Sequence, residues 1–351
     1  MVNNWQKTKM KKMLLLMLAM MIANISFAQQ QLATLNHDGN ISVFYGSTAF
    51  RDALYASVNG DIITLSPGRF DALYEDEDGF HNKAVTIRGA GMFSDTLGNY
   101  STDIEYMCIH DDSDTIRNLV FEGINFGRIY CGDLNNVKFI KCRINSIYSY
   151  DYQYRTEGMQ FINCIIERFY LSKHFNTQFI NSVILSFDDR NGDASFVNCI
   201  AKLYASEEAL SSKYIMNSII YYNDNDGEEK ERNATTSYYS IGILDLSGEG
   251  YGLSANYYDT DYTPDHNLHN YHTLNSVFKT FNGEYSASET YELKDEIASS
   301  ILGDDGTQVG IYGGPAPFDT NVRNPRIKRC TVASRATTDN KLAVDIEVAT
   351  E

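Results

Sequence analysis

Phe139-Ile140-Lys141-Cys142 is a four-residue pattern that returns along the chain as Phe161-Ile162-Asn163-Cys164, Phe179-Ile180-Asn181-Ser182, Phe196-Val197-Asn198-Cys199 and Ile215-Met216-Asn217-Ser218. Val120-Phe121-Glu122-Gly123-Ile124 fits one step earlier, so the intervals between aligned first residues are 18, 22, 18, 17 and 19 residues. A helical repeat would need about 30 to 45 residues per unit. The spacing therefore predicts the single coils of a solenoid.

Each repeat unit predicts a strand, a bend and a second strand. Phe, Ile and Val are typical of strands, whereas Asn tolerates the left-handed backbone of a tight bend and can hydrogen-bond its neighbours. An Asn that recurs once per coil would form a ladder at one corner, with the small Cys or Ser after it stacked inside. We therefore expect an all-β fold, a right-handed parallel β-helix of roughly eight to ten coils at about 18 to 20 residues per coil.

Both ends of this solenoid have their own signals. Apolar side chains at Phe50, Leu54 and Val58 predict a capping helix over residues 47–59, which would protect the unpaired strand edges at that end. The period-two alternation of residues 326–332 and 341–348 predicts a C-terminal β-hairpin.

Two segments carry a resemblance to a known group of proteins. The capping helix followed by Gly60-Asp61-Ile62-Ile63-Thr64-Leu65-Ser66-Pro67-Gly68 resembles the start of secreted parallel β-helix proteins of the pectin-lyase-like superfamily. Asp304-Asp305-Gly306-Thr307-Gln308-Val309-Gly310-Ile311-Tyr312-Gly313-Gly314-Pro315 is similar to the closing segment of many such proteins from Bacteroidetes. The resemblance covers roughly residues 45–316 and implies a fold, but no single activity, because this architecture serves lyases, hydrolases, adhesins and uncharacterised surface proteins alike.

The first 28 residues match a secretory signal peptide, with four lysines, an apolar run at residues 13–22 and a small-x-small site at Ser26-Phe27-Ala28. That run is shorter than the roughly 20 residues of a membrane-spanning helix. We expect a secreted chain in the periplasm or on the surface of a Gram-negative bacterium, with no transmembrane segment after cleavage. Residues 29–316 would form the β-helix, with a loop-rich insertion at 223–270, and residues 317–351 the hairpin tail.

The charge balance excludes several partners. The chain has 29 basic and 46 acidic side chains, a formal charge of -17, and loss of the four leader lysines takes it to -21. Binding to nucleic acid or to an anionic membrane needs clustered Lys and Arg, so neither partner is expected.

One apolar row should lie on the outside of the coils. If the first residue of the four-residue pattern points inward, the second should point outward. The second residue is nevertheless apolar in every unit, namely Ile140, Ile162, Ile180, Val197 and Met216. An exterior apolar stripe is usually covered. We expect residues 326–348 or a partner chain to cover it, and we interpret residues 274–278 as one more coil corner and residues 291–302 as a strand or short helix.

The cysteines do not indicate a metal site. Cys142, Cys164 and Cys199 share one repeat position, which favours buried free thiols, because side chains that project in parallel are poorly placed for a disulfide. The other three, Cys108, Cys131 and Cys330, show no CxxC spacing.

The candidate ligand-binding residues are tyrosines and aspartates. Tyr148, Tyr150, Tyr152 and Tyr154 fall in the 22-residue interval, which predicts a loop protruding from the solenoid. Tyr offers a flat apolar face with a hydroxyl at its edge, which suits contact with a sugar ring, although such tyrosines can also simply cover a sheet. Asp188 and Asp189 follow the corner of the third unit and complete this set.

A calcium site is the only cofactor hypothesis that the acidic runs support. Asp224, Asp226 and Glu228 could supply several oxygens from one bend, as calcium requires. Only half of an EF-hand-like loop is present, and solvated turns explain the acidic runs at lower cost.

The leading functional hypothesis is a non-catalytic secreted or cell-surface protein whose loops bind a glycan or a protein partner. The alternative is a carbohydrate-active enzyme, a polysaccharide lyase or glycoside hydrolase, for which Arg143, Arg168 and Lys202 lie near the corners of nearby coils. A structural stalk or adhesin segment is the second alternative.

Overall fold

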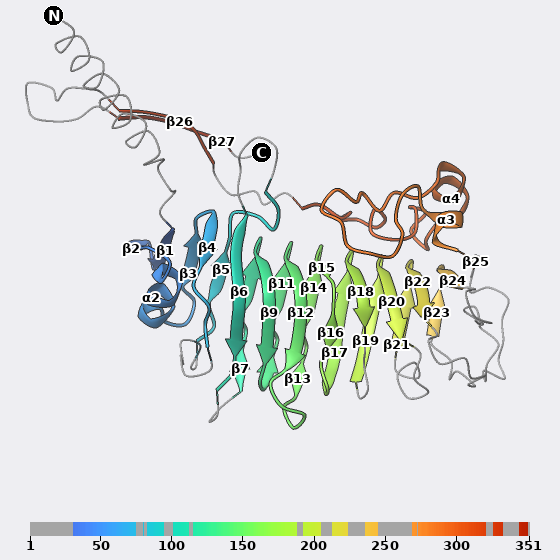
Figure 1. Ribbon diagram of the computed structural model, residues 1–351, viewed down its shortest axis with the longest axis horizontal. Helices are drawn as coiled ribbons and strands as arrows, with labels where there is room; N and C mark the ends of the chain where they lie inside the picture. The colour runs from blue at the N-terminus through green and yellow to red at the C-terminus, as the bar shows by residue number, and fades with distance from the viewer. Residues whose placement is uncertain are drawn as a thin grey trace, which may run out of the picture.

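The repeated units stack as parallel coils, and the chain forms an all-β solenoid of about six turns with 47% strand and 8% helix (Figure 1). The computed structural model describes residues 31–74, 80, 83–94, 101–111, 115–187, 192–204, 213–223, 236–244, 269–271, 273–320, 326–332 and 344–349. The expected all-β parallel β-helix is confirmed. The turns are fewer than the eight to ten expected, because residues 273–320 add no coils to the solenoid.

Sheet A has 14 strands and keeps the repeated Phe in one register. Phe139 pairs with Phe121 on one side and with Phe161 on the other, so equivalent residues of successive coils stack directly. The strands are β2 (Asn40–Tyr45), β1 (Leu32–His37), β3 (Ile62–Leu65), β5 (Thr86–Arg88), β8 (Val120–Glu122), β11 (Lys138–Ile140), β14 (Gln160–Ile162), β17 (His174–Ile180), β19 (Gly192–Val197), β21 (Lys213–Met216), β23 (Thr236–Tyr238), β13 (Thr156–Glu157), β10 (Leu134–Asn135) and β7 (Ile116–Arg117).

Sheet B has 11 strands and receives the chain after each corner. Its strands are β4 (Gly68–Phe70), β6 (Thr102–Ile109), β9 (Asn125–Cys131), β12 (Arg143–Ser149), β15 (Ile165–Ile166), β16 (Phe169–Tyr170), β18 (Val183–Phe187), β20 (Ile200–Tyr204), β22 (Ile219–Asn223), β24 (Ile241–Leu244) and β25 (His269–Tyr271). Every strand pair in this sheet is parallel.

The inward positions form columns of one residue type. Five phenylalanine rings stack with centroids 5.0–5.1 Å apart and planes within 13° of parallel, namely Phe121, Phe139, Phe161, Phe179 and Phe196. The small residues after the corner are also fully buried, and Cys142, Cys164 and Cys199 are free thiols there, as expected. Burial raises the pKa of the Cys199 thiol to about 12, so it stays protonated.

The corner has the expected left-handed backbone. Asn163, Asn181, Asn198 and Asn217 have φ between 46° and 53°, and Lys141 takes the same conformation in the coil where it replaces Asn. Asn adopts this region more readily than most residues, since its short polar side chain can bond locally. The ladder of asparagines at one corner is therefore confirmed.

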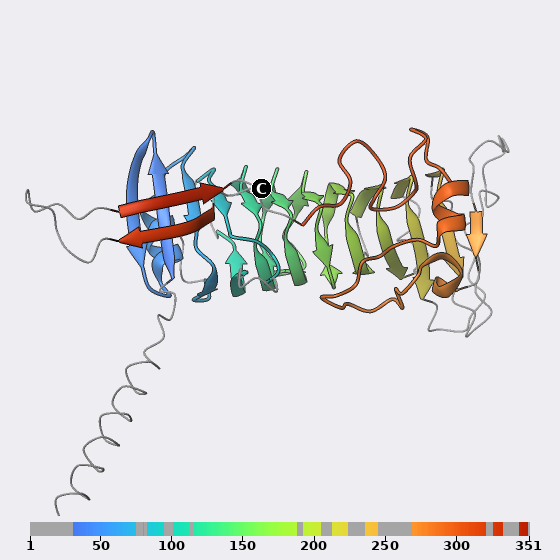
Figure 2. The same cartoon turned by 90° about the horizontal axis from the view of Figure 1, so that it is seen from above.

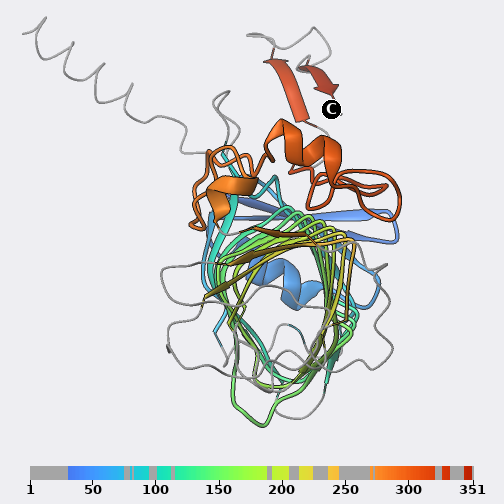
Figure 3. The same ribbon diagram turned by 90° about the vertical axis from the view of Figure 1, so that its right-hand side faces the viewer.

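The expected capping helix is present as α2 (Ala49–Ala56), within residues 47–59. It buries Ala49, Phe50, Ala53 and Leu54 against the first strands, and Figure 3 shows it lying inside the outline of the solenoid. Two antiparallel strands, β1 and β2, extend sheet A at this end, joined by a two-residue turn at Asp38-Gly39. Both turn residues have positive φ, which gives the twist that such a hairpin needs.

Residues 273–320, which we call the covering segment, lie outside the coils (Figures 1 and 2). They include α3 (Leu274–Val277) and α4 (Asp295–Ser300). The interpretation of residues 274–278 as a coil corner is therefore wrong. Residues 291–302 include a short helix, one of the two elements expected there.

The C-terminal hairpin forms from β26 (Arg326–Val332) and β27 (Val344–Ala349), as expected. Figures 1 and 3 show both strands standing clear of the two sheets. The expectation that this hairpin covers an exterior apolar stripe is wrong. Its proposed target, the row that contains Ile140 and Ile162, is half-buried, and the stripe that is fully covered belongs to sheet B.

Candidate functional site

One outward row of sheet B changes character along the solenoid. In register from one coil to the next, it contains Asp103, Asn125, Arg143, Ile165, Val183, Ile200, Ile219 and Ile241. The first three side chains are polar and half-exposed, and the last five are apolar and at most 2% exposed. We call the outer face of β4, β6, β9 and β12 the open half, and that of β15, β18, β20, β22 and β24 the covered half.

The covering segment accounts for the burial of the covered half. Its side chains Val277, Phe281 and Ile311 pack into one apolar cluster with the isoleucines of the outward row. At Gly310, where φ is +85°, an added Cβ would lie 3.0 Å from Ile219 Cδ1, so the segment passes very close to the sheet. Figure 2 shows the segment above the C-terminal coils and not above the first coils.

The corner asparagines also hold the covering segment. Asn181 is 1% exposed, and its Nδ2 donates to the carbonyls of Ile311 and Gly313 at 2.9 and 2.8 Å. Asn217 Nδ2 donates to Asp304 Oδ1 at 2.7 Å, and its Oδ1 accepts the Asp304 N–H at 3.1 Å. The closing segment at residues 304–315 therefore docks on the asparagine ladder.

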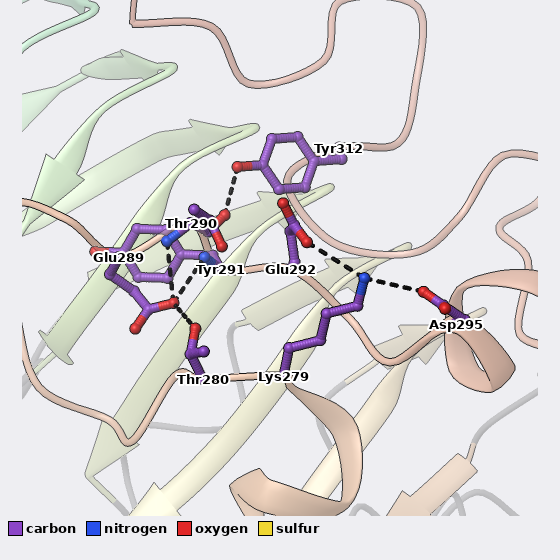
Figure 4. Close-up of polar contacts among 8 residues, drawn as sticks. All are labelled: Lys279, Thr280, Glu289, Thr290, Tyr291, Glu292, Asp295 and Tyr312. Carbon is purple, nitrogen blue, oxygen red and sulfur yellow. Dashed lines mark hydrogen bonds and ion pairs between the residues drawn. The ribbon is translucent and has the colours of Figure 1, made fainter.

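Polar contacts stiffen the covering segment itself (Figure 4). Lys279 Nζ lies 2.9 Å from Asp295 Oδ1 and 3.3 Å from Glu292 Oε2, and the hydrogen bond to Asp295 raises the pKa of Lys279. Glu289 Oε1 accepts the Thr280 hydroxyl at 2.7 Å, and the Tyr312 hydroxyl donates to the Thr290 carbonyl. These contacts lie within the segment and do not include the open half.

A hydrogen-bonded network lies at the boundary between the open half and the covering segment. Arg143 Nη1 donates to Asn125 Oδ1 at 2.8 Å, and Nη2 donates to Glu167. Asn125 Nδ2 donates in turn to Asp103 Oδ1 at 2.8 Å. The Arg143 guanidinium lies 4.2 Å from the centroid of the Tyr285 ring, a cation-π contact that joins this network to the covering segment.

A ladder of tyrosines runs along the open half and ends on the neighbouring strand β16. Its rings have centroid separations of 5.1, 5.3, 5.5 and 5.4 Å, in the order Tyr74, Tyr106, Tyr130, Tyr148 and Tyr170. Tyr148 pairs in register with Tyr130 and Tyr170. The rings stack on one another, four of the five side chains are partly exposed, and Tyr74 at the end of the ladder is 56% exposed.

A hollow of about 820 Å³ opens at the Tyr74 end of the ladder. It is lined by the residues Gln31, Arg69, Phe70, Asp71, Ala72, Tyr74, Glu105, Tyr106, Gly127, Arg128 and Asn145. Arg69 pairs with Glu105, and both side chains are about two-thirds exposed. Asp71 accepts a hydrogen bond from the Ser47 hydroxyl at 2.9 Å.

Polar partners contact both carboxylates that line the hollow. Both carboxylates of the hollow already have partners, Arg69 for Glu105 and Ser47 for Asp71. Within the described part of the chain, no group of three or more His, Cys, Asp or Glu side chains could hold a metal ion. What the hollow offers a ligand is an aromatic wall with hydrogen-bond donors and acceptors beside it.

The predicted tyrosines fall in two places. Tyr148 lies on strand β12 and belongs to the ladder, so its expected place on a loop is wrong. Tyr150 and Tyr154 pack on His110, with centroids 4.3 and 4.8 Å from the imidazole ring, and Tyr152 is 80% exposed on the turn before β13. The alternating tyrosines therefore begin on strand β12 and continue into the turn after it, where two of them pack on His110.

The remaining predicted site residues lie outside the described residues, namely Asp188, Asp189, Asp224, Asp226 and Glu228, and so do the signal peptide and most of residues 223–270. Of the basic residues considered for catalysis, Arg143 is held by Asn125 and Glu167. The described residues contain no helix long and apolar enough to cross a membrane.

The hollow itself was not predicted, but the ladder has a signal in the sequence. Tyr130, Tyr148 and Tyr170 each follow the repeated Phe of their own coil by nine residues. The residues of the first coils, such as Arg69 and Arg128, precede the regular repeat or occupy positions that vary from coil to coil. These residues line one hollow only because the coils that carry them stack on one another.

Comparison of the chain with models of protein families, with curated proteins and with solved structures finds no match.

Proposed function

We propose that this is a secreted β-helix protein that binds a glycan on the open half of sheet B. The observation that carries the proposal is the tyrosine ladder, which ends in the hollow at Tyr74 and Tyr106. A sugar has an apolar ring face and hydroxyls around it, and aromatic walls with polar groups beside them match both. A polymer could follow the partly exposed ladder, since a phenol hydroxyl can both donate and accept a hydrogen bond.

The charges of the hollow favour a neutral glycan. Its lining contains two basic side chains, Arg69 and Arg128, and two acidic ones, Asp71 and Glu105. A lining of both signs supplies donors and acceptors without attracting a polyanion, and a chain with a formal charge of -17 repels one. We therefore place neutral polysaccharides ahead of polyuronates.

The cellular setting belongs to the same proposal. The leader-like first 28 residues support export to the periplasm or surface of a Gram-negative bacterium, where polysaccharides are available as ligands. The capping helix and the parallel coils support membership of the pectin-lyase-like β-helix proteins. A non-catalytic role is favoured because both carboxylates of the hollow are engaged.

The test is a glycan array of the purified protein, followed by titration with the best neutral polysaccharide and a parallel assay for new reducing or unsaturated ends. Arg128→Ala and Tyr74→Ala should each weaken binding by about tenfold, the loss of roughly 1.4 kcal/mol. Tyr214→Ala is the matched control, because Tyr214 is 40% exposed on sheet A, away from the hollow. Equal weakening by the control, or no neutral glycan bound, contradicts the proposal; release of chain ends replaces it with the enzyme alternative.

A further inference from the structure

The first strand in space, β2, is an exposed sheet edge. Among the described strands it pairs only with β1, and Figure 1 shows it at the N-terminal end of the solenoid. None of its six residues is charged and none is proline, and all of them except Phe44 are exposed. Natural edge strands are usually protected by Lys, Pro, a bulge or a covering element, and β2 shows none of these within the described structure.

The hydrogen bonds of β1 show which backbone groups of β2 face outward. The Gly46 N–H donates to the Gln31 carbonyl at 2.8 Å, and the Ser66 N–H donates to the Leu32 carbonyl at 2.8 Å. Odd-numbered residues of β1 therefore face β2, and even-numbered ones face β3. Given the β1–β2 register, residues 40, 42 and 44 bond to β1, which leaves the N–H and C=O groups of Ile41, Val43 and Tyr45 pointing outward.

The same three residues carry exposed apolar side chains. Ile41 is 67% exposed, Val43 42% and Tyr45 60%, and all three lie on the outer face of sheet A. Successive side chains of a strand point to opposite faces of the sheet. A partner strand therefore buries these three side chains only if its own apolar side chains lie on the same face.

From this geometry we infer that β2 pairs with β2 of a second copy of the chain, in antiparallel orientation about a two-fold axis at Val43. In this register Val43 lies opposite Val43 of the copy, and Ile41 lies opposite Tyr45 of the copy. The outward N–H and C=O groups of the three residues then pair with the outward groups of the same residues in the copy. The side chains of both strands stay on the same face of the joined sheet. A shift by one residue would bring backbone groups already bonded to β1 into the interface.

The register supports a second copy as the occupant, because the outward residues Ile41, Val43 and Tyr45 match the same three residues of another β2 in reverse order. Two chains with a formal charge of -17 repel each other over most of their surface, and β2 offers a strand free of charge where they can approach. A two-fold axis uses one surface twice, as symmetric dimers do. Six residues make a small interface, so we expect a dimer that dissociates on dilution.

The decisive experiment is light scattering or sedimentation of the purified protein over a dilution series. The mass of the wild-type protein should rise with concentration from one chain toward two. Val43→Pro removes an outward N–H without touching the β1–β2 bonds, and Val43→Lys places two like charges opposite each other, so both variants should stay at the mass of one chain. Tyr214→Lys, which adds the same charge elsewhere on sheet A, should keep the rise.

Folding is checked in parallel by circular dichroism and thermal unfolding. Val43→Pro should unfold near the wild-type temperature, whereas Ser42→Pro, which removes an N–H that bonds to β1, should lower it. A wild-type protein that stays at one chain throughout overturns the inference. A folded Val43→Pro variant that still doubles its mass also overturns it, because assembly then uses another surface.

Discussion

The covered and open halves of sheet B share one interior and differ on the outside. The stacked phenylalanines and the small corner residues run through both, so a coil can be built in the same way whichever half it occupies. Outside, the same register position holds Arg143 in the open half and Ile200 in the covered half. The inward positions therefore define the fold, and the outward positions define what lies against it.

The largest expected change in unfolding free energy comes from replacing one outward side chain in each half of sheet B. Ile200 is 0% exposed beneath the covering segment, so Ile200→Asp buries an unpaired charge and should cost about 4 kcal/mol or more of unfolding free energy. Asn125→Leu at the same register removes hydrogen bonds to Asp103 and Arg143 on the open half and should cost about 1 kcal/mol. Chemical denaturation measures both, and equal losses would mean that the covering segment does not seal its half.

A smaller effect is expected at the asparagine ladder. Asn181→Ala removes two hydrogen bonds to the covering segment and places Ala at a φ of 46°, and should cost about 3 kcal/mol. Asn163→Ala has the same backbone strain at a φ of 53°, but lies one coil earlier, and should cost about 1 to 2 kcal/mol. Asn181→Gly relieves the strain, so the loss that remains measures the contacts to the covering segment alone.

Equal losses for Asn181→Ala and Asn163→Ala, again from denaturant unfolding, would assign the whole role of the ladder to its backbone conformation. A large loss for Asn181→Ala that Asn181→Gly recovers in full would lead to the same conclusion. Only a loss that persists in Asn181→Gly supports docking of residues 304–315 on the corner.

The sequence was sufficient for the interior because each inward position repeats with the coil. Phe, Asn and the small residue recur at 17 to 22 residues, and the parallel register follows from that recurrence. The outward rows differ in this respect, because two of them are apolar in several coils and the repeat does not show which one the chain itself covers. The row that contains Ile140 was expected to be covered, whereas the row with Ile165, Val183 and Ile200 is the buried one.

The hollow could not be predicted for a different reason. Arg69 comes from the first coil, Glu105 from the second and Arg128 from the third, and no periodicity links them. Their proximity depends on stacking of coils with unequal loops. The ladder, by contrast, follows the coil period, and the nine-residue offset from each Phe to Tyr130, Tyr148 and Tyr170 would have revealed it.

The smallest expected effect tests the boundary between the halves. Tyr285 of the covering segment is half-buried, and burial raises the pKa of its phenol, whereas the Arg143 guanidinium beneath it acts in the opposite direction. A raised pKa means that the folded state favours the neutral phenol. The stability that this contributes is complete below the unfolded pKa of about 10 and is lost as the pH rises through the folded pKa.

Removing the positive charge of Arg143 should therefore raise the pKa of Tyr285. In Arg143→Gln the pKa of Tyr285 should rise further, and the protein should lose more stability in alkali than the wild type does, because the unfolded phenol ionises while the folded one resists. Nuclear magnetic resonance of labelled tyrosine, with Tyr285→Phe to assign the signal, follows the titration directly. A Tyr285 signal with an ordinary pKa, or one unmoved by Arg143→Gln, would place Tyr285 away from Arg143 in solution. The contact between Arg143 and Tyr285 would then not mark the boundary between the covered and open halves.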